Sequence, residues 1–386
     1  MFRLCILALL TLAPSLESFD AAMAPFMKER GVPGGALAVV KDGRLVYAKG
    51  YGFADIDAKV EVEPTSLFRI ASVSKPITAV AIFTLVQKGK LELDAKAFAL
   101  LGLEPGEKGD RHLADITVRQ LLHHTAGWDR EKSGDPMFKS IEIAEAMGAA
   151  PPADANAIIR WMLGRPLDFD PGARHAYSNF GYCVLGRIIE KLSGESYETY
   201  VKKAVLEPMG ISRMRLGKSL LKDRAQGEVC YYQPKATAER SVFGRDGERN
   251  VPWPYGGFCL EAMDAHGGWL ASAVDLARFA SSLEKVLDAK SIDTMFARPA
   301  GLKPSSAYYA CGWMVRPIGK DGRANTWHNG SLPGTNTLLV RRHDGLTWVA
   351  LFNQRSSNDG DIDPALHRAA DAVVEWPKED LFSRLR

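Results

Sequence analysis

The sequence predicts an α+β fold in which one antiparallel sheet, built from the N- and C-terminal segments, is flanked by helices and carries an inserted all-helical lobe. Two observations predict it. Apolar residues alternate on both sides of Asp42-Gly43, and strand-like patterns return after Tyr308. The patterns between these two regions are mostly helical. One sheet shared by both ends of the chain is the economical arrangement.

The first elements follow from local patterns. Apolar residues recur at helical spacing over 16–30 and stop at Gly31, which predicts a helix. The run "GALAVVKDGRLVYAKGYG" (35–52) has the Asp-Gly signature of a β-hairpin. In "ITVRQLLHHTAG", Thr117 and Gln120 form a capping box that begins a further helix.

The remaining elements are predicted in the same way. Apolar faces predict helices over 178–194 and 272–287, and a final helix from about 364 to 374. Four strand patterns follow Tyr308: "YYACGWMVRP", "ANTWHNG", "TNTLLVRR" and "LTWVALFNQ". No period survives over 225–262, which predicts a long surface loop, and 129–155 is a second irregular region.

Composition excludes some classes of function. The chain has 386 residues, 25% of them charged, with a formal charge of +3. No basic block occurs, so we expect no nucleic-acid partner. No HExxH or CxxC motif occurs, so we expect no metal site and no cofactor. A small-molecule partner fits this composition.

The N-terminus has the pattern of an export signal. Arg3 precedes an apolar run over 4–13, which is too short to span a bilayer, and small residues follow. We therefore expect residues 1–18 to be a signal peptide, cut near Ser15 or Ser18, and the protein to be secreted or periplasmic without stable membrane insertion afterwards. The alternative is a buried N-terminal helix. Four cysteines would remain, and isolated core thiols are favoured over a disulfide between Cys230 and Cys259.

The motif S-x-x-K occurs three times, as Ser72/Lys75, Ser219/Lys222 and Ser282/Lys285. The motif alone cannot decide between them, but its setting can. The third pair lies within the helix predicted over 272–287, and the second lies in a basic connector. Only Ser72 and Lys75 lie where a strand-like segment enters a helix, and residues three apart on a helix share a face.

A hydroxyl becomes a good nucleophile only when a base removes its proton. Lysine serves as that base when burial or nearby cations make it neutral, and a tyrosine can share the task. Tyr177-Ser178-Asn179 provides such a tyrosine at a predicted helix start. The alternative is that Tyr177 packs and that Ser178 or Asn179 only caps the helix.

A third segment, "TWHNGSLPG" (326–334), lies between strand patterns. Gly330 would let a substrate approach the backbone closely. The N–H groups of Ser331 and Ser72 would then provide two donors for a developing oxyanion.

In this order, S-x-x-K, Y-x-N and H-x-G resemble the motifs of the serine β-lactamase-like family. This family includes penicillin-binding proteins, class C β-lactamases and family VIII carboxylesterases. The resemblance extends over about 20–360, and it also includes "LLHHTAGW" and "HGGWLASAVDLARFA".

The resemblance implies an α/β sandwich and a helical lobe with the site between them. The chain would be one catalytic unit over 19–386, with an α/β lobe of about 19–70 plus 265–386 and a helical lobe of about 71–264. Ser72 would be the acylated nucleophile, and Lys75 and Tyr177 would exchange its proton. Asn179 would hold Lys75 or the substrate, and His328 would line the acyl or leaving-group side.

The sequence departs from many β-lactamases of this family at His328, where they carry the lysine of Lys-Thr-Gly. Histidine is mostly neutral at pH 7, so a substrate carboxylate would be anchored weakly. We therefore expect a carboxylesterase-like serine hydrolase. The alternatives are a D-Ala-D-Ala carboxypeptidase, a D-aminopeptidase or a β-lactamase with the same site, or a non-catalytic binding protein. Each enzyme would act on a small ester, amide or β-lactam.

Overall fold

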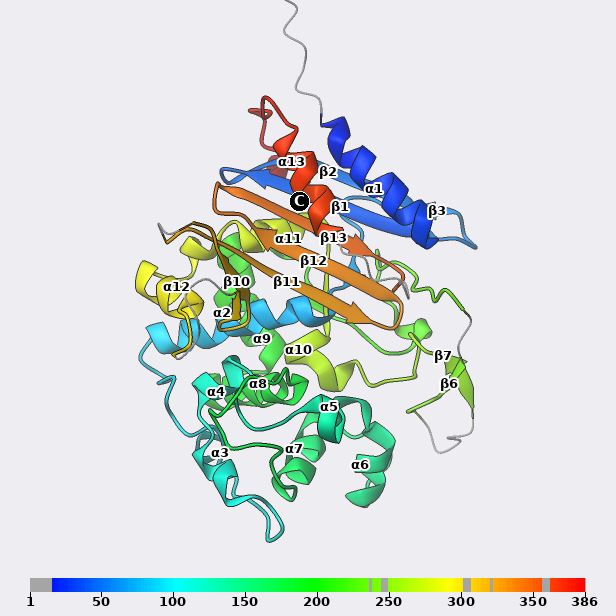
Figure 1. The fold of residues 1–386 in the computed structure, drawn as a ribbon. Helices are drawn as coiled ribbons and strands as arrows, with labels where there is room; N and C mark the ends of the chain where they lie inside the picture. The colour runs from blue at the N-terminus through cyan, green and yellow to red at the C-terminus, as the bar shows by residue number, and fades with distance from the viewer. Residues whose placement is uncertain are drawn as a thin grey trace, which may run out of the picture.

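The computed structural model describes residues 16–235, 238–243, 249–300, 307–319, 322–355 and 362–385. An eight-stranded antiparallel sheet dominates it, in the order β3-β2-β1-β13-β12-β11-β10-β9 (Figure 1). Its strands are β1 (Gly34–Lys41), β2 (Arg44–Asp55), β3 (Val60–Glu61), β9 (Tyr308–Tyr309), β10 (Met314–Pro317), β11 (Ala324–Leu332), β12 (Thr335–Arg341) and β13 (Leu346–Phe352). The predicted sheet from both ends of the chain is confirmed, because β1 pairs with β13.

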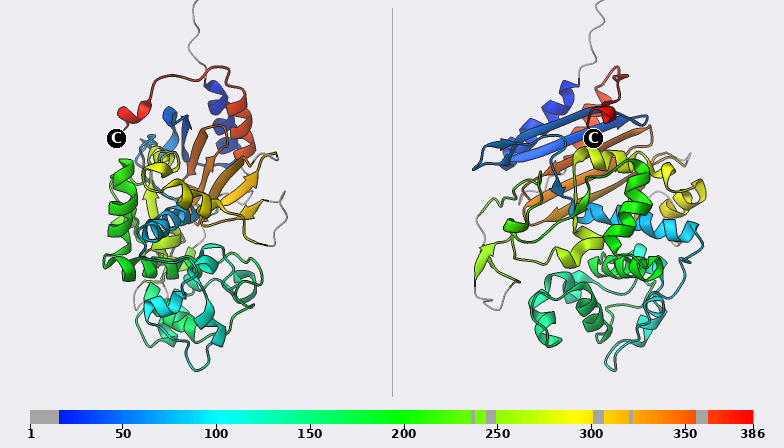
Figure 2. Two further views of the ribbon diagram at one scale, coloured as in Figure 1. Left: turned by 90° about the vertical axis from the view of Figure 1, so that its left-hand side faces the viewer. Right: turned by 180° about the vertical axis from the view of Figure 1, so that it is seen from behind.

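The outer face of the sheet is covered by the helices at the two ends of the chain, α1 (Glu17–Arg30) and α13 (Asp363–Asp371) (Figure 2). Phe19 of α1 and Leu366 of α13 pack with Leu37 and Trp348 of the sheet in one buried apolar cluster. The other face packs on α2 (Ser74–Gln87) and α11 (Ala273–Ala280). The strands of the sheet centre are therefore apolar on both faces.

Helix α2 is the central helix of the molecule. Its residues 74–85 are all buried, so it carries no polar face to solvent. In Figure 1 it runs between the sheet and a group of helices on the side opposite α1. The remaining helices are α3 (Ala97–Leu101), α4 (Val118–Leu122), α5 (Arg130–Ser133), α6 (Ser140–Ala146), α7 (Ala155–Leu163), α8 (Asn179–Ser193), α9 (Tyr197–Val201), α10 (Asp264–Gly267) and α12 (Ala289–Phe296). The lobe boundaries expected from the sequence stay a prediction.

Several expectations about elements were wrong. The region 129–155, expected to be irregular, contains α5 and α6, and the strand pattern over 308–317 is divided into β9 and β10. The helix expected over 272–287 ends at Ala280, and a 3-10 turn, η8 (Leu283–Lys285), follows it. The hydroxyl of Ser281 donates to the carbonyl of Ala277, 2.8 Å away, and this local bonding weakens helix continuation. The loop expected over 225–262 contains a hairpin of β6 (Ala238–Arg240) and β7 (Asn250–Pro252).

A smaller sheet joins distant parts of the chain near the start of α2. Its strands are β4 (Phe68–Arg69), β8 (Trp269–Ala271) and β5 (Arg215–Leu216). The predicted hairpin turn at Asp42-Gly43 and the capping box of Thr117 and Gln120 are both confirmed. Both hairpin-turn residues have positive φ, 49° and 77°, as a type I′ turn requires.

The expected signal peptide lies mostly outside the described residues. Ser18, one of the two expected cleavage positions, lies within α1, where its hydroxyl donates to the carbonyl of Ala369, 2.9 Å away. In the described part of the chain, each helix is too short or too polar to cross a bilayer. The cysteines at 183, 230, 259 and 311 are free thiols, as expected.

Candidate active site

The predicted residues meet where the end of β11 approaches the start of α2. Ile70 follows strand β4, and a 3-10 turn, η1 (Ala71–Val73), leads directly into α2. Ala71 has φ of 48°, a left-handed conformation that is rare for a residue with a Cβ atom and often marks functional sites. This turn presents Ser72 half-buried, while its neighbours on both sides are buried.

Ser72 and Lys75 are in contact, as the sequence predicts. The Nζ atom of Lys75 lies 3.1 Å from the Oγ atom of Ser72. Pro76, the third residue of α2, is tolerated there because the first N–H groups of a helix have no partner within it. The pair therefore lies at the first turns of the central helix.

The surroundings of Lys75 suit a base. Its amine donates to Oδ1 of Asn179, 2.7 Å away, and to the carbonyl of His266, 3.0 Å away. Both partners are acceptors, so a neutral amine uses its two N–H groups on them and directs its lone pair to the hydroxyl of Ser72. Burial lowers the pKa of Lys75 well below its usual value, and the charge of Arg130 lowers it further, against the opposing effect of Asp135.

Tyr177 comes to the same point from the segment before α8. Nζ of Lys75 and the guanidinium carbon Cζ of Arg130 each lie 4.8 Å from the centroid of its ring. Burial raises the pKa of Tyr177, while a hydrogen bond with Ser72 and the charge of Arg130 act in the opposite direction. The phenol is therefore positioned to exchange a proton with Ser72.

Ser178 and Asn179 have different roles: Ser178 caps a helix, and Asn179 contacts Lys75. The hydroxyl of Ser178 caps α8 by accepting the N–H of Gly181, so one part of the structural alternative is correct. Asn179, in contrast, connects Lys75 to a carboxylate, because its Nδ2 donates to Oδ2 of Asp135, 2.6 Å away. Asp135 in turn accepts the N–H of Met137.

His328 lies on β11 and is 3% exposed. Its Nδ1 is 2.6 Å from the carbonyl of Asn329, which can only accept, so Nδ1 carries the proton. Its Nε2 then accepts from the hydroxyl of Tyr309, 3.0 Å away. Burial and the charge of Lys75 lower the pKa of His328 to about 3, so the ring is neutral at pH 7.

Gly330 is where β11 touches the turn that carries Ser72. A Cβ atom on Gly330 would lie 2.4 Å from the carbonyl of Ile70 and 3.1 Å from the nitrogen of Ser72. Strand β10 pairs with only the first part of β11, 324–327. Leu332 and Thr335 close a two-residue hairpin loop, so the N–H of Ser331 points away from β12 toward the unpaired edge.

The surroundings of the other two S-x-x-K serines indicate a structural rather than a catalytic role. Ser219 is fully buried and hydrogen-bonded to the carboxylate of Glu261 and the N–H of Leu260. Ser282 precedes the 3-10 turn η8. Of the three matches, only Ser72 and Lys75 show a hydrogen bond between the side chains of the two motif residues.

Sequence reasoning missed four side chains around the site: His124, Arg130, Asp135 and Tyr309. Arg130 and Asp135 come from the irregular region 129–155, which has no periodic pattern to place them. His124 lies just after α4 (Val118–Leu122). It is buried, its ring lies 4.3 Å from that of Tyr177, and its Nδ1 accepts the N–H of Ser178. Only the position of His124 beside another histidine singled it out in the sequence.

A family model described as Beta-lactamase matches residues 19–372. Penicillin-binding protein 4* of Bacillus subtilis (strain 168) is 26% identical over 372 residues, which cover 91% of this chain and 74% of that protein. The octameric penicillin-binding protein homologue from Pyrococcus abyssi is 27% identical, with a TM-score of 0.69 over 95% of this chain and 78% of that one. A D-amino acid amidase from Ochrobactrum anthropi SV3 shares the fold, with a TM-score of 0.71 at 22% identity over 92% of this chain and 98% of that one.

The fold and the family match define a serine hydrolase. The chain belongs to the β-lactamase family, and the resemblance to serine β-lactamases and penicillin-binding proteins is confirmed.

Proposed function

We propose that the protein hydrolyses small acyl compounds through an acyl-enzyme on Ser72. The observation that carries this proposal is the contact of a half-buried Ser72 with the buried amine of Lys75, 3.1 Å apart. Lys75 and Tyr177 are the two candidate bases. The hydrogen bonds that occupy two N–H groups of Lys75 support the lysine as the base, and the contacts of the Tyr177 ring with Lys75 and with the Arg130 cation support a shared role.

In the proposed reaction, the Ser72 hydroxyl gives its proton to the base as its oxygen bonds to the substrate carbonyl carbon. The N–H groups of Ser72 and Ser331 hold the resulting oxyanion. The bond to the leaving group then breaks, and the leaving group takes the proton from Lys75 or Tyr177. Water attacks the ester to Ser72 by the same steps and releases the acid.

We propose an uncharged ester as the preferred substrate. His328 is buried, hydrogen-bonded at both ring nitrogens and neutral, so it provides no fixed cation for a substrate carboxylate. A β-lactam carries such a carboxylate, and its turnover should therefore be poor.

The first test measures hydrolysis of a p-nitrophenyl ester by Ser72→Ala. We expect kcat/KM to fall by about four orders of magnitude, because removal of the nucleophile leaves only binding and oxyanion contacts. Ser282→Ala is the matched control, since it alters an S-x-x-K serine outside the site, and it should keep full activity. Circular dichroism should show both variants folded. An active Ser72→Ala would contradict the proposal.

A second candidate is a peptidase or amidase that acts on D-amino acid substrates. Its support is the similarity to penicillin-binding protein 4* over 91% of this chain, together with the fold shared with the D-amino acid amidase. Parallel assays with nitrocefin, a p-nitrophenyl ester and a D-Ala-D-Ala peptide separate the candidates. Fastest turnover of the peptide would replace the esterase proposal.

A non-catalytic binding protein is a further alternative, which turnover of any of the three substrates would exclude. Export to a secreted or periplasmic location also stays a proposal, supported by the sequence pattern over 1–18. The N-terminus of the protein purified from the native host tests it: the mature chain would begin just after Ser15 or Ser18.

A further inference from the structure

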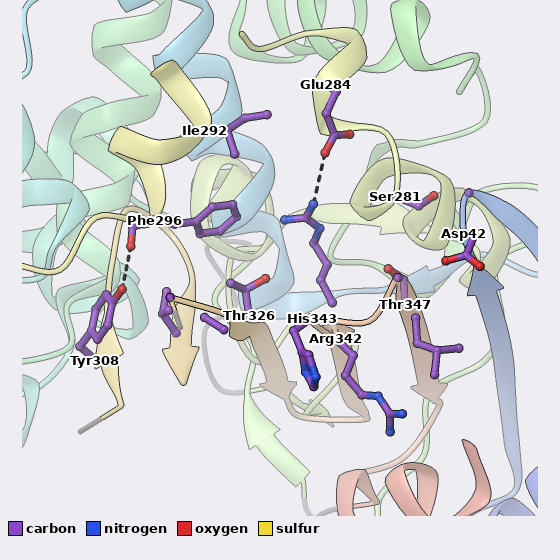
Figure 3. A pocket seen from close by; sticks show the side chains of 17 residues that line it. Asp42, Ser281, Glu284, Ile292, Phe296, Tyr308, Thr326, Arg342, His343 and Thr347 are labelled. Atoms are coloured by element: carbon purple, nitrogen blue, oxygen red, sulfur yellow. Dashed lines mark hydrogen bonds and ion pairs between the residues drawn. The ribbon is translucent and has the colours of Figure 1, made fainter. Parts of the chain in front are cut away.

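A hollow opens on the face of the sheet that packs on α2 and α11, at the end of β11 away from Ser72 (Figure 3). Its volume is about 520 Å³, within the usual range of small-molecule sites. Helix α12 and the turn η8 form one wall, and strands β10 to β13 form the other.

Three strands align polar side chains across the floor of this hollow. Arg341 of β12 lies directly opposite Thr326 of β11 on one side and Thr347 of β13 on the other. Residues paired in this way project from the same face of a sheet. A guanidinium group flanked by two hydroxyls is therefore built into the sheet, and all three residues line the hollow.

The positive charge of the Arg341 guanidinium is only weakly balanced by nearby carboxylates. Its side chain is 21% exposed, and its Nη2 lies 3.6 Å from Oε1 of Glu284, which is beyond hydrogen-bond length. The side chain of Glu284 is itself 65% exposed, so the attraction of its carboxylate is screened by water. Burial lowers the pKa of Arg341, against the opposing effect of Glu284. An anion bound beside Arg341 would offset this cost.

The hydroxyl of Thr326 is a second unsatisfied group. Thr326 is 6% exposed, and its Oγ1 is buried without a hydrogen-bond partner among the residues that the structure describes. Buried hydroxyls nearly always have a partner. A ligand oxygen that contacts Arg341 from the hollow could also accept from this hydroxyl.

The remaining lining restricts the ligand. Phe296 and Ile292 of α12 provide an apolar wall, and the ring centroid of Phe296 lies 5.5 Å from Cζ of Arg341. Two carboxylates, Glu284 and Asp42, also line the hollow and would repel a multiply charged anion (Figure 3). These walls suit a single negative charge on an apolar group.

We propose that this hollow binds a small monocarboxylate with an apolar or aromatic tail, held by Arg341 and Thr326. The site is distinct from the one at Ser72. Thr326 precedes Gly330 by four residues, about 13 Å along a strand. Tyr308 lines the hollow, whereas its neighbour Tyr309 is hydrogen-bonded to His328 of the candidate active site.

Isothermal titration with benzoate and with inorganic phosphate, at constant ionic strength, tests the proposal. We expect benzoate to bind at one site and more tightly than phosphate. Benzoate should bind equally well after a fluorophosphonate has blocked Ser72. Failure of benzoate to bind, equal or tighter binding of phosphate, or loss of benzoate binding after the block would overturn the proposal.

Two variants locate the ligand. Arg341→Gln should weaken benzoate binding at least tenfold. Thr326→Val, which keeps the side-chain shape, should weaken benzoate binding several-fold. This variant still tests the proposal if Arg341→Gln folds poorly. Arg316→Gln is the matched control, because Arg316 lies exposed on β10 and outside the hollow, and it should bind as the wild type does. Wild-type binding by Thr326→Val and Arg341→Gln would overturn the assignment.

Discussion

At the scale of single residues, a chain of hydrogen bonds determines how the Lys75 amine meets Ser72. Asp135 accepts from Asn179, and Asn179 accepts from Lys75, at 2.6 and 2.7 Å. The sequence predicted Ser72, Lys75, Tyr177 and Asn179 because they lie in short motifs. It could not predict Asp135, because an aspartate in an irregular segment has no pattern that distinguishes it from an ordinary turn residue.

Substitution of Asp135 should therefore affect catalysis more than folding. In Asp135→Asn, one side-chain oxygen cannot serve both Asn179 and the N–H of Met137 equally well. A lost hydrogen bond of this kind costs about 1–3 kcal/mol, so we expect kcat to fall about tenfold to a hundredfold with little change in KM. Asp154→Asn, at the N-cap of α7, is the control and should leave kcat unchanged. An equal loss in both variants would contradict a role in positioning.

The pH dependence of ester hydrolysis tests the charges around Lys75. A base with a lowered pKa is active above that pKa, so kcat/KM should fall as the pH drops through it. Asp135 raises the pKa of Lys75 and Arg130 lowers it. The acid limb of the kcat/KM profile should therefore move to lower pH in Asp135→Asn and to higher pH in Arg130→Gln. Shifts in the same direction would show that another group controls this limb.

At the scale of elements, the site depends on how closely β11 approaches the turn before α2. The sequence predicted both segments and the need for a glycine, because strand patterns and tight contacts leave local signals. It could not show that the 3-10 turn would abut β11, since such an approach depends on long-range packing. The predicted end of the helix over 272–287 was wrong for a related reason. The apolar pattern continues past Ser281 and Ser282, whereas the helix stops before them.

Gly330→Ala tests this approach. The added Cβ atom would lie within 2.4 Å of the Ile70 carbonyl and the Thr337 hydroxyl, so β11 must move away from Ser72. We expect kcat/KM for the ester to fall at least about a hundredfold, since a displacement of 1 Å at a reacting centre has that effect. Gly164→Ala is the control, because among the described residues the nearest contact of its added Cβ atom, the carbonyl of Trp161, is at an ordinary 3.5 Å. Full activity of Gly330→Ala would show that the Ser331 N–H is not needed near Ser72.

At the scale of the whole molecule, the two ends of the chain form one sheet, and a buried side chain fastens them. Asn353, after β13, accepts the N–H of Gly34 at 2.8 Å and donates to the carbonyl of Phe53 at 3.0 Å. It is fully buried. The sequence predicted that the ends share a sheet, but not that β13 pairs with β1, because the apolar pattern of a strand does not identify the strand that it pairs with.

Asn353→Ala leaves these two backbone groups without this partner, and the bond to Gly34 is buried. We expect the free energy of unfolding to fall by about 2–6 kcal/mol, measured by urea denaturation followed by circular dichroism. Asn250→Ala, at an exposed position on β7, is the control and should change stability little. A wild-type midpoint for Asn353→Ala would contradict the importance of this contact.

The most direct measurement is the mass-spectrometric mapping of the adduct formed with a fluorophosphonate probe. The proposed mechanism predicts one adduct per chain, on the peptide that contains Ser72, and slow labelling of Lys75→Met, which lacks the amine. Labelling of a different residue, or an intact protein of unchanged mass, would contradict the assignment of Ser72 as the nucleophile.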